Sequence, residues 1–325
     1  MDGLTEIGII WRGELVRALQ SGRAVVLLLL FLLFTALLLG ITGVASYTAT
    51  ESQGRKFDEE IEKSPFKDDL DPKKVAEQRA KSTNTSGFKK LAITTLFAED
   101  DTALAEMLLA LPFMLLIVFK LTLIFLPLFI TLIGFDQISG EISTKSIRYL
   151  AVRVRRSSLV VGKFLAQTSV LGLLTFVCVA MMIGVSLFVD PDFTAGKAAG
   201  TFVKLWLVAV VFSIAYMALA SMCSSMFKQP AVSLVLNMII LFLIWAVALV
   251  GNIFQIPGQA VSGMSLSSYK TESVVAYARY LSVWNYAPDL IHPSWQRFTA
   301  AGAAHLGFAM VFLAASYLVL RTRDV

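Results

Sequence analysis

An uninterrupted apolar run at residues 24–46 constrains the fold more than any other feature of this sequence. It contains no charged side chain, and Leu27–Leu33 consists only of leucine and phenylalanine. In a helix that rises 1.5 Å per residue, such a run extends about 35 Å, which exceeds the roughly 30 Å hydrocarbon core of a bilayer. Because lipid offers no partners for backbone polar groups, the run must cross as an α-helix. The sequence therefore predicts an integral membrane protein.

Further apolar runs are also long enough to cross a membrane. Hydrophobic residues make up 57% of the 325 residues and charged residues only 16%, against roughly 45–50% and 25% in soluble domains. We expect an all-α polytopic membrane protein with six transmembrane helices, an N-terminal amphipathic interfacial helix and a charged extracytoplasmic insert. The expected spans are 24–46, 108–134, 164–188, 201–224, 231–252 and 303–320.

The second span is the least regular of the six. The apolar stretch Leu104–Gly134 is too long for one plain crossing and is interrupted by Pro112, Lys120 and Pro127. Proline removes a helical hydrogen bond and clashes with the preceding turn. The stretch is therefore either one long kinked helix or an interfacial helix that leads into a span.

Residues 1–23 are expected to form a cytoplasmic amphipathic helix. Apolar residues recur there at helical spacing opposite Glu6, Arg17 and Gln20, a pattern typical of a helix on the membrane surface. An ordinary cytosolic lead-in is the alternative. No small-residue cleavage site follows the first apolar run closely, so we expect no cleaved signal peptide. The apolar positions are Leu4, Ile7, Trp11, Leu15 and Ala18.

Two long segments are expected outside the cytoplasm. Residues 47–107 hold ten Lys and Arg and thirteen Asp and Glu, so we expect a hydrated insert in which 57–63 and 72–81 could form helices. Such balanced charge is typical of a solvated face, and a ligand site is the alternative. Residues 253–302 are moderately apolar and contain glycine and proline, so they could enter the membrane as short broken helices.

The distribution of Lys and Arg predicts that both termini are cytoplasmic. Short cytoplasmic loops carry an excess of these residues, whereas long loops cross the membrane largely regardless of charge. The loop 135–163 holds six of them, and residues 1–23 and the tail 321–325 together hold five. The insert 47–107 and the segment 253–302 are then expected on the opposite side.

Residues suited to catalysis do not converge in this sequence. His292 and His305 are the only histidines, and neither lies in H-E-x-x-H or beside clustered carboxylates. The stretch nearest to a P-loop, Ser139–Ser146, has Ser139 and Thr144 where glycines must stand. The spans hold few ionisable side chains, which disfavours an ion-coupled carrier. We expect no enzyme activity, no metal site and no cofactor in this chain, and no nucleic-acid partner.

The loop 135–163 is the candidate functional segment. An apolar stripe of Ile142, Ile147, Leu150 and Val154 lies between its basic residues, which predicts a short amphipathic helix. This helix could lie under the lipid headgroups or dock into the groove of a cytosolic partner, and the residues alone favour neither. The six basic residues are Lys145, Arg148, Arg153, Arg155, Arg156 and Lys163.

The stretch Phe135–Leu150, continued by Arg155-Arg156-Ser157-Ser158 and Gly162-Lys163, resembles the permeases of ABC-2 type transporters. In that family a glutamate follows the second span, and Gly-Lys begins the third. The sequence departs from the pattern at Ser143, where glycine is usual, and near Val152 and Val154, where proline is expected. The six-span layout, the N-terminal helix and the segment Trp284–Asp289 are also similar. The matching positions are Glu141, Ser143–Ser146, Tyr149-Leu150, Arg155-Arg156 and Gly162-Lys163.

The resemblance implies a permease subunit that exports a substrate while a separate ABC ATPase subunit hydrolyses ATP. Two ATPase copies, which bind ATP and Mg²⁺, would contact a homodimer or pseudo-dimer of permeases among the lipids of the cell membrane, the inner or plasma membrane of a bacterium. The loop after the second span would transmit the motion of the ATPase. The implied ATPase-coupling residues are Glu141, Thr144, Ser146, Tyr149, Arg153, Arg155, Arg156 and Lys163.

A membrane scaffold or envelope-assembly factor is the alternative function. Such a protein would dock an extracytoplasmic partner through residues 47–107 and would need no substrate cavity. A partner ATPase separates the two hypotheses, because only the transporter subunit requires one. A membrane-embedded enzyme is disfavoured, since the spans lack converging acid and base residues.

Overall fold

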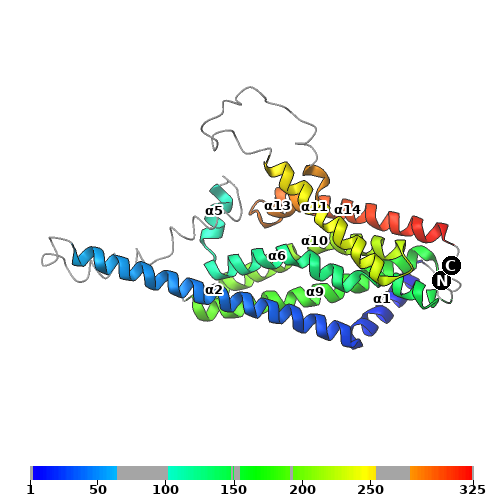
Figure 1. Ribbon diagram of the computed structural model, residues 1–325, viewed down its shortest axis with the longest axis horizontal. Helices are drawn as coiled ribbons and strands as arrows, with labels where there is room; N and C mark the ends of the chain where they lie inside the picture. The colour runs from blue at the N-terminus through cyan, green and yellow to red at the C-terminus, as the bar shows by residue number, and fades with distance from the viewer. Residues whose placement is uncertain are drawn as a thin grey trace, which may run out of the picture. The chain divides into compact units, whose positions relative to one another are not determined.

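All regular secondary structure that the computed structural model describes is helical (Figure 1). The structure describes residues 3–63, 102–147, 149, 154–190, 193–253 and 279–323. Six helices in these ranges are long and apolar enough to cross a membrane, so the predicted all-α polytopic fold is confirmed. The candidate spans are Val25–Ala45, Phe113–Ser143, Arg156–Val189, Ala195–Met226, Pro230–Leu249 and Trp295–Thr322.

The chain divides into two compact units, which are described separately. Unit 1 comprises Met1–Leu29, Ile124–Val177 and Val203–Val325, and unit 2 comprises Leu30–Leu123 and Cys178–Phe202. The candidate functional loop and every contact described for it below lie within unit 1.

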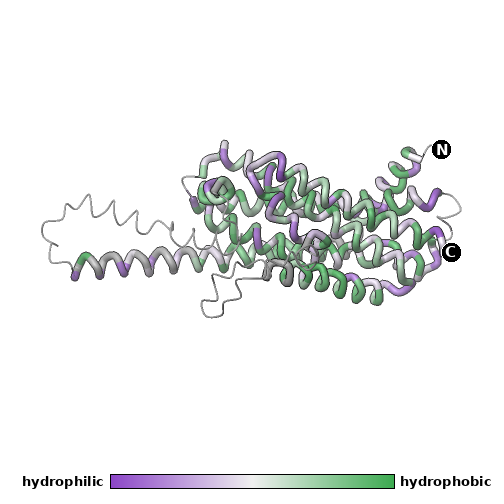
Figure 2. The backbone as a smooth tube through the Cα atoms, turned by 90° about the horizontal axis from the view of Figure 1, so that it is seen from above, coloured by the Kyte–Doolittle hydropathy of each residue, from purple (hydrophilic) through white to green (hydrophobic). Residues whose placement is uncertain are grey.

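Helix α2 (Gly22–Glu62) continues well past its membrane span. It has 41 residues, or about 60 Å at 1.5 Å per residue. Beyond the span it becomes more hydrophilic toward Glu62 (Figure 2). Ion pairs between residues four apart support this part, with Arg55 Nη2 2.5 Å from Glu51 Oε1. The hydrated helix expected at 57–63 is therefore the end of α2, whereas 72–81 lies outside the described residues.

The irregular second span consists of two helices. Helix α5 (Thr102–Leu109) ends before Pro112, and α6 (Phe113–Gly134) begins directly after it. The stretch is thus two helices that separate at Pro112, and a position of α5 at the membrane interface stays a prediction. Within unit 2, Leu104 and Leu108 of α5 are each 1% exposed, so α5 is held by packing of its apolar side chains. Pro127 is accommodated inside α6.

Helices α9 (Arg156–Val189) and α10 (Ala195–Met226) are longer than the expected spans. Helix α9 begins at Arg156, so its first two turns occupy what the sequence suggested was loop. Within unit 1, the Trp206 indole of α10 donates to the Gly172 carbonyl of α9 at 2.9 Å. Such interhelical hydrogen bonds and close packing hold helices together where lipid supplies no hydrophobic driving force.

Short helices precede the last span, as the glycine- and proline-containing segment suggested. The chain forms η2 (Arg279–Leu281), η3 (Val283–Tyr286) and α13 (Ala287–Ile291) before α14 (Trp295–Thr322) begins. The Ser282 hydroxyl donates to the Ile244 carbonyl of α11 (Pro230–Ile253) at 2.9 Å. Residues 254–278 lie outside the described residues.

The close approach of α6 and α10 gives a test of this packing. A Cβ atom at Gly134 would lie 2.8 Å from the Ala220 Cβ and 3.3 Å from the Met217 sulfur. We expect Gly134→Ala to lower the free energy of unfolding by about 1–3 kcal/mol, because the two helices must separate. Thermal unfolding of the purified protein in detergent measures this change.

Gly307→Ala on α14 is the matched control, since no atom lies within 4 Å of the added methyl group. Alanine is also the better helix former by up to about 1 kcal/mol. A Gly134→Ala protein that melts at the same temperature as the Gly307→Ala protein would contradict the close approach.

Candidate functional site

The candidate loop begins at a short helix anchored to α10. Helix α7 (Ser139–Ser143) follows α6 after a tight turn. The backbone N–H groups of Ile138 and Ser139 both donate to Ser224 Oγ of α10, each at 3.0 Å. The Gln137 side-chain amide donates to the Ser221 hydroxyl one turn earlier on α10. Because helix N-terminal N–H groups have no intrahelical partner, these serines fix the position of α7.

The chain then turns sharply at Lys145. This residue has φ 60°, the left-handed region that favours glycine, and α7 ends two residues before it. The prediction of one amphipathic helix through 142–154 is therefore wrong at this point. A continuous helix would need right-handed dihedrals at Lys145, and the turn instead sends Ile142 and Ile147 back toward the same core.

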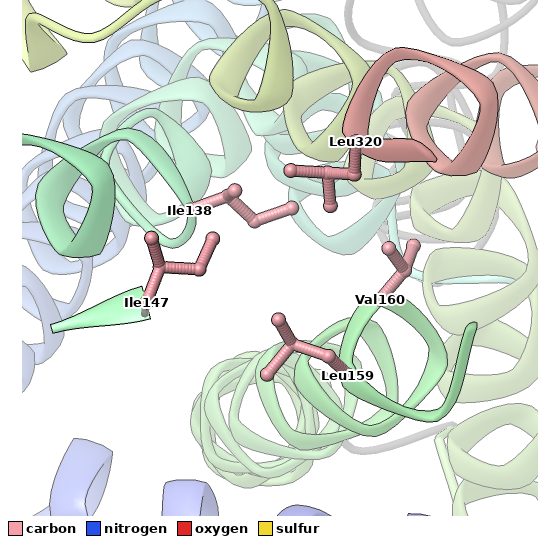
Figure 3. Close-up of a cluster of buried hydrophobic side chains, with 5 residues drawn as sticks. All are labelled: Ile138, Ile147, Leu159, Val160 and Leu320. Atoms are coloured by element: carbon pink, nitrogen blue, oxygen red, sulfur yellow. The ribbon is translucent and has the colours of Figure 1, made fainter. Parts of the chain in front are cut away.

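Part of the apolar stripe of the loop packs within the protein itself. Ile138, Ile147, Leu159, Val160 and Leu320 form one buried cluster, and Ile142 packs against it (Figure 3). Leu159 and Val160 belong to α9 and Leu320 to α14. The expectation that the stripe lies under headgroups or in a partner's groove is thus corrected for Ile142 and Ile147, because their own chain packs against them, whereas Val154 is only partly buried. Leu150 of the stripe lies outside the described residues.

An ion cluster holds the loop between α1 (Gly3–Gln20) and α9. Lys163 Nζ lies 2.7 Å from Glu141 Oε1 and 2.9 Å from Glu14 Oε1. Arg17 Nη1 lies 3.2 Å from the same Glu14 oxygen and 3.5 Å from the same Glu141 oxygen. The cluster therefore consists of two carboxylates and two cations, which come from α1, α7 and α9.

The burial of this cluster makes the pairing obligatory. The Lys163 side chain is only 4% exposed, and those of Glu141 and Glu14 are 14% and 15% exposed. An isolated charge at such a depth costs several kcal/mol of desolvation, which only close, well-oriented partners offset. Glu141 and Lys163 match the two ends of the family pattern noted in the sequence, and in the structure they form an ion pair.

Helix α1 lies along α9 through further contacts. The Ser158 hydroxyl donates to Glu6 Oε2 at 3.0 Å, and the Trp11 indole donates to Ser169 Oγ at 3.0 Å. A Cβ atom at Gly162 would lie 2.8 Å from the Ile10 Cβ, so only glycine permits this approach.

The residues that α1 turns toward the protein differ from those of the predicted amphipathic helix. Glu6 and Glu14 make contacts within the protein, whereas Leu4, Ile9 and Val16 are exposed by 83%, 56% and 45%. Exposed apolar side chains beside a membrane span fit a lipid environment. The acidic face of α1 is therefore its packing face.

Arg156 connects the start of α9 to the end of α14. Its Nη1 atom donates to the carbonyl oxygens of Leu320, Arg321 and Arg323 at 2.5, 2.9 and 3.1 Å. The last carbonyls of a helix lack intrahelical donors and carry partial negative charge, so a guanidinium is a favourable partner there.

The predicted coupling residues separate into exposed and internal groups. Tyr149 is 80% exposed, and Thr144 and Arg155 are also exposed. The internal residues bond to their own chain as described for Glu141, Arg156 and Lys163, and the Ser146 hydroxyl lies 3.0 Å from Thr144 Oγ1. Arg153 lies outside the described residues. A role of these residues in ATPase coupling stays a prediction.

Sequence reasoning missed Glu6, Glu14 and Arg17 as partners of the loop. The signal that could have found them is charge complementarity, because acidic residues eight apart lie on one face of α1, and the segment after the second span is strongly basic. Their assignment to a water-facing surface hid this possibility.

A cavity of about 530 Å³ adjoins the ion cluster. One part of its wall is polar and includes Asp136, Gln137 and the charged cluster, and another part is apolar and includes Leu132 and Leu174. Its volume falls in the range of roughly 300–1,000 Å³ that is usual for small-molecule sites.

The buried lysine provides a test of the site. We expect Lys163→Met to lower the free energy of unfolding by about 3 kcal/mol, because Glu14 and Glu141 then face each other with only the exposed Arg17 as partner. Lys145→Met is the matched control, since Lys145 is exposed and both substitutions remove one charge. Equal melting temperatures for the two variants in detergent would contradict the buried ion cluster.

The family of the chain follows from comparison with known proteins. A family model described as "ABC-2 family transporter protein" matches residues 9–325. No curated protein matches the chain. The family match covers all six candidate spans and the loop with its ion cluster. The chain belongs to the ABC-2 family of transporter proteins and is a multi-pass transmembrane permease of an ABC transporter.

Proposed function

We propose that this permease exports a substrate by receiving force from a separate ABC ATPase at the surface formed by Thr144, Tyr149 and Arg155. The observation that supports this proposal most directly is the set of contacts between the loop and the surrounding helices. One short segment is hydrogen-bonded to α10, ion-paired to α1 and α9, and packed against α14. A segment connected in this way can move several spans at once.

The exposed residues suit a protein partner. Tyr149 offers a large ring with a hydroxyl, and such residues are enriched at interfaces. Arg155 offers a guanidinium, and its backbone N–H lies 3.4 Å from Glu6 Oε2 of α1. A displacement of this surface is therefore passed directly to α1 and α9.

ATP and Mg²⁺ belong to the partner in this proposal. They supply the free energy that closes the ATPase, while this chain supplies the anchored loop. Interfaces and packed cores switch between discrete arrangements rather than deforming continuously. The α7 segment would then move as a body, because Ser224 and the Glu141–Lys163 pair fix both of its sides.

We further propose a dimer of permeases with both termini in the cytoplasm. The excess of Lys and Arg in the loop 135–163 supports this orientation. The start of α1 and the end of α14 lie at the same end of unit 1, since Arg155 is close to Gly3 and Arg156 bonds Arg321. The bacterial inner or plasma membrane is the proposed location.

A double substitution at the exposed surface tests the coupling proposal. Tyr149→Ala with Arg155→Glu should reduce the ATPase that co-purifies with the tagged permease about 10-fold or more, because both changes remove contacts without entering the core. Mass spectrometry identifies the partner by its complete P-loop, and ATP hydrolysis by the complex is measured in parallel. The melting temperature of the permease alone should not change.

Lys197→Glu on the first turn of α10 is the control, since it reverses an exposed charge outside the loop sequence 135–163. Full retention of ATPase and ATP hydrolysis by the double variant would overturn the proposal. It would also favour a scaffold role, in which no ATPase is needed.

The left-handed turn provides a second test through the backbone. Lys145→Gly and Lys145→Val remove the same charge, but valine is excluded from φ near +60° whereas glycine relieves about 1–2 kcal/mol of strain. We expect the glycine variant to keep the ATPase and the valine variant to lose it. Equal behaviour of the two proteins in the co-purification assay would show that the turn does not present the partner surface.

A further inference from the structure

The wall of the cavity beside the ion cluster extends along α9 for about the thickness of one leaflet of a bilayer. Its wall includes Lys163 and, eleven residues further along α9, Leu174. This separation corresponds to about 16 Å along the helix, close to half of the roughly 30 Å hydrocarbon core. The apolar part is completed by Leu27, Leu28 and Leu132. The cavity wall thus combines a charged part with an apolar part.

The polar end favours a cation that donates hydrogen bonds. Its wall contains three carboxylates, Glu14, Asp136 and Glu141, against the two cations Arg17 and Lys163, so one negative charge is in excess. Glu141 Oε2 and Gln137 Oε1 are buried acceptors without a hydrogen-bond partner. A buried acceptor without a donor is unfavourable, and both side chains belong to the cavity wall. A donor that enters the cavity can therefore satisfy both.

The rim of the cavity is apolar and exposed. Leu19, Val25 and Leu173 line the cavity and are 46%, 49% and 49% exposed. Val25 begins the first candidate span and Leu173 lies inside the third. In a membrane these side chains meet lipid, so an amphiphile can enter from the side without crossing water.

We propose that this cavity binds a phospholipid with a primary ammonium headgroup, phosphatidylethanolamine in chemical class. The ammonium group would meet Glu141 and Gln137, the phosphate would meet Arg17, whose side chain is 70% exposed, and one acyl chain would follow Leu132 and Leu174. Arginine suits phosphate because its planar fork has donors to spare. The bound lipid would tie α1 to the loop. This inference concerns a lipid site and stands whether or not an ATPase binds.

Thermal unfolding of the full-length protein in detergent tests the site with three soluble probes. Dioctanoyl phosphatidylethanolamine should raise the melting temperature by about 3 °C or more at saturating concentration. Dioctanoyl phosphatidylcholine should have little effect, because its quaternary ammonium has no N–H donor. Dodecylamine distinguishes a lipid from a cationic amphiphilic cargo, since it has the ammonium and the chain but no phosphate.

Substitutions in the cavity wall test whether the lipid raises the melting temperature by binding there. Val170→Trp fills the apolar part and should abolish the shift with phosphatidylethanolamine, whereas Leu165→Trp, on an exposed position of the same helix, should preserve it. Leu173→Trp at the half-exposed rim gives a second filling variant that keeps the test valid if Val170→Trp does not fold.

Three results would each overturn the proposal. If phosphatidylcholine raised the melting temperature as much as phosphatidylethanolamine, the N–H donors would have no role. If dodecylamine raised it as much as phosphatidylethanolamine, the cavity would instead bind a cationic cargo. Retention of the lipid shift in both filling variants would place the lipid elsewhere. Retention of the ATPase by the protein with Tyr149→Ala and Arg155→Glu, together with an unchanged lipid shift, would overturn the transport proposal alone.

Discussion

The Lys163 side chain needs carboxylate partners because it is almost completely buried. It is 4% exposed within unit 1, and Glu14 and Glu141 are the groups that compensate its charge. Removing a partner from a buried pair leaves a charge that the surroundings cannot solvate, which is far costlier than losing a surface pair. The positions of α1, of α7 and of the first turns of α9 are therefore linked. Helix α1 supplies Glu14, α7 supplies Glu141 and α9 supplies Lys163, and the buried charges are compensated only when all three are in place.

The contacts around this pair follow the same logic. Ser224 satisfies backbone donors at the start of α7, and Arg156 satisfies carbonyls at the end of α14. Helix ends that lie close to a bilayer need such partners, because unsatisfied groups are costly at low dielectric constant. The apolar cluster around Ile147 and Leu320 fills the space between these polar contacts. Polar and apolar contacts together make the described residues of the loop part of the helical bundle, while Thr144, Tyr149 and Arg155 stay exposed.

The spans were predictable because a bilayer imposes a length and a polarity on every helix that crosses it. Residues 24–46 had no other plausible structure. The ends of α9 and α2 were not predictable from hydropathy, since charged residues such as Lys163 and Arg55 continue a helix when ion pairs compensate them. The turn at Lys145 could not be predicted from the sequence, because lysine has no preference for positive φ. The family pattern identified Glu141 and Lys163 separately, but their contact with Glu14 depends on the tertiary placement of α1.

The length of α2 has a mechanical consequence. The helix continues for seventeen residues beyond Ala45 to Glu62 without a break, which adds about 26 Å outside the candidate span. A tilt of about 10° within the span would move the far end by about 4–5 Å if the helix stays straight. A tilt of the first span therefore displaces the polar end of α2 outside the span.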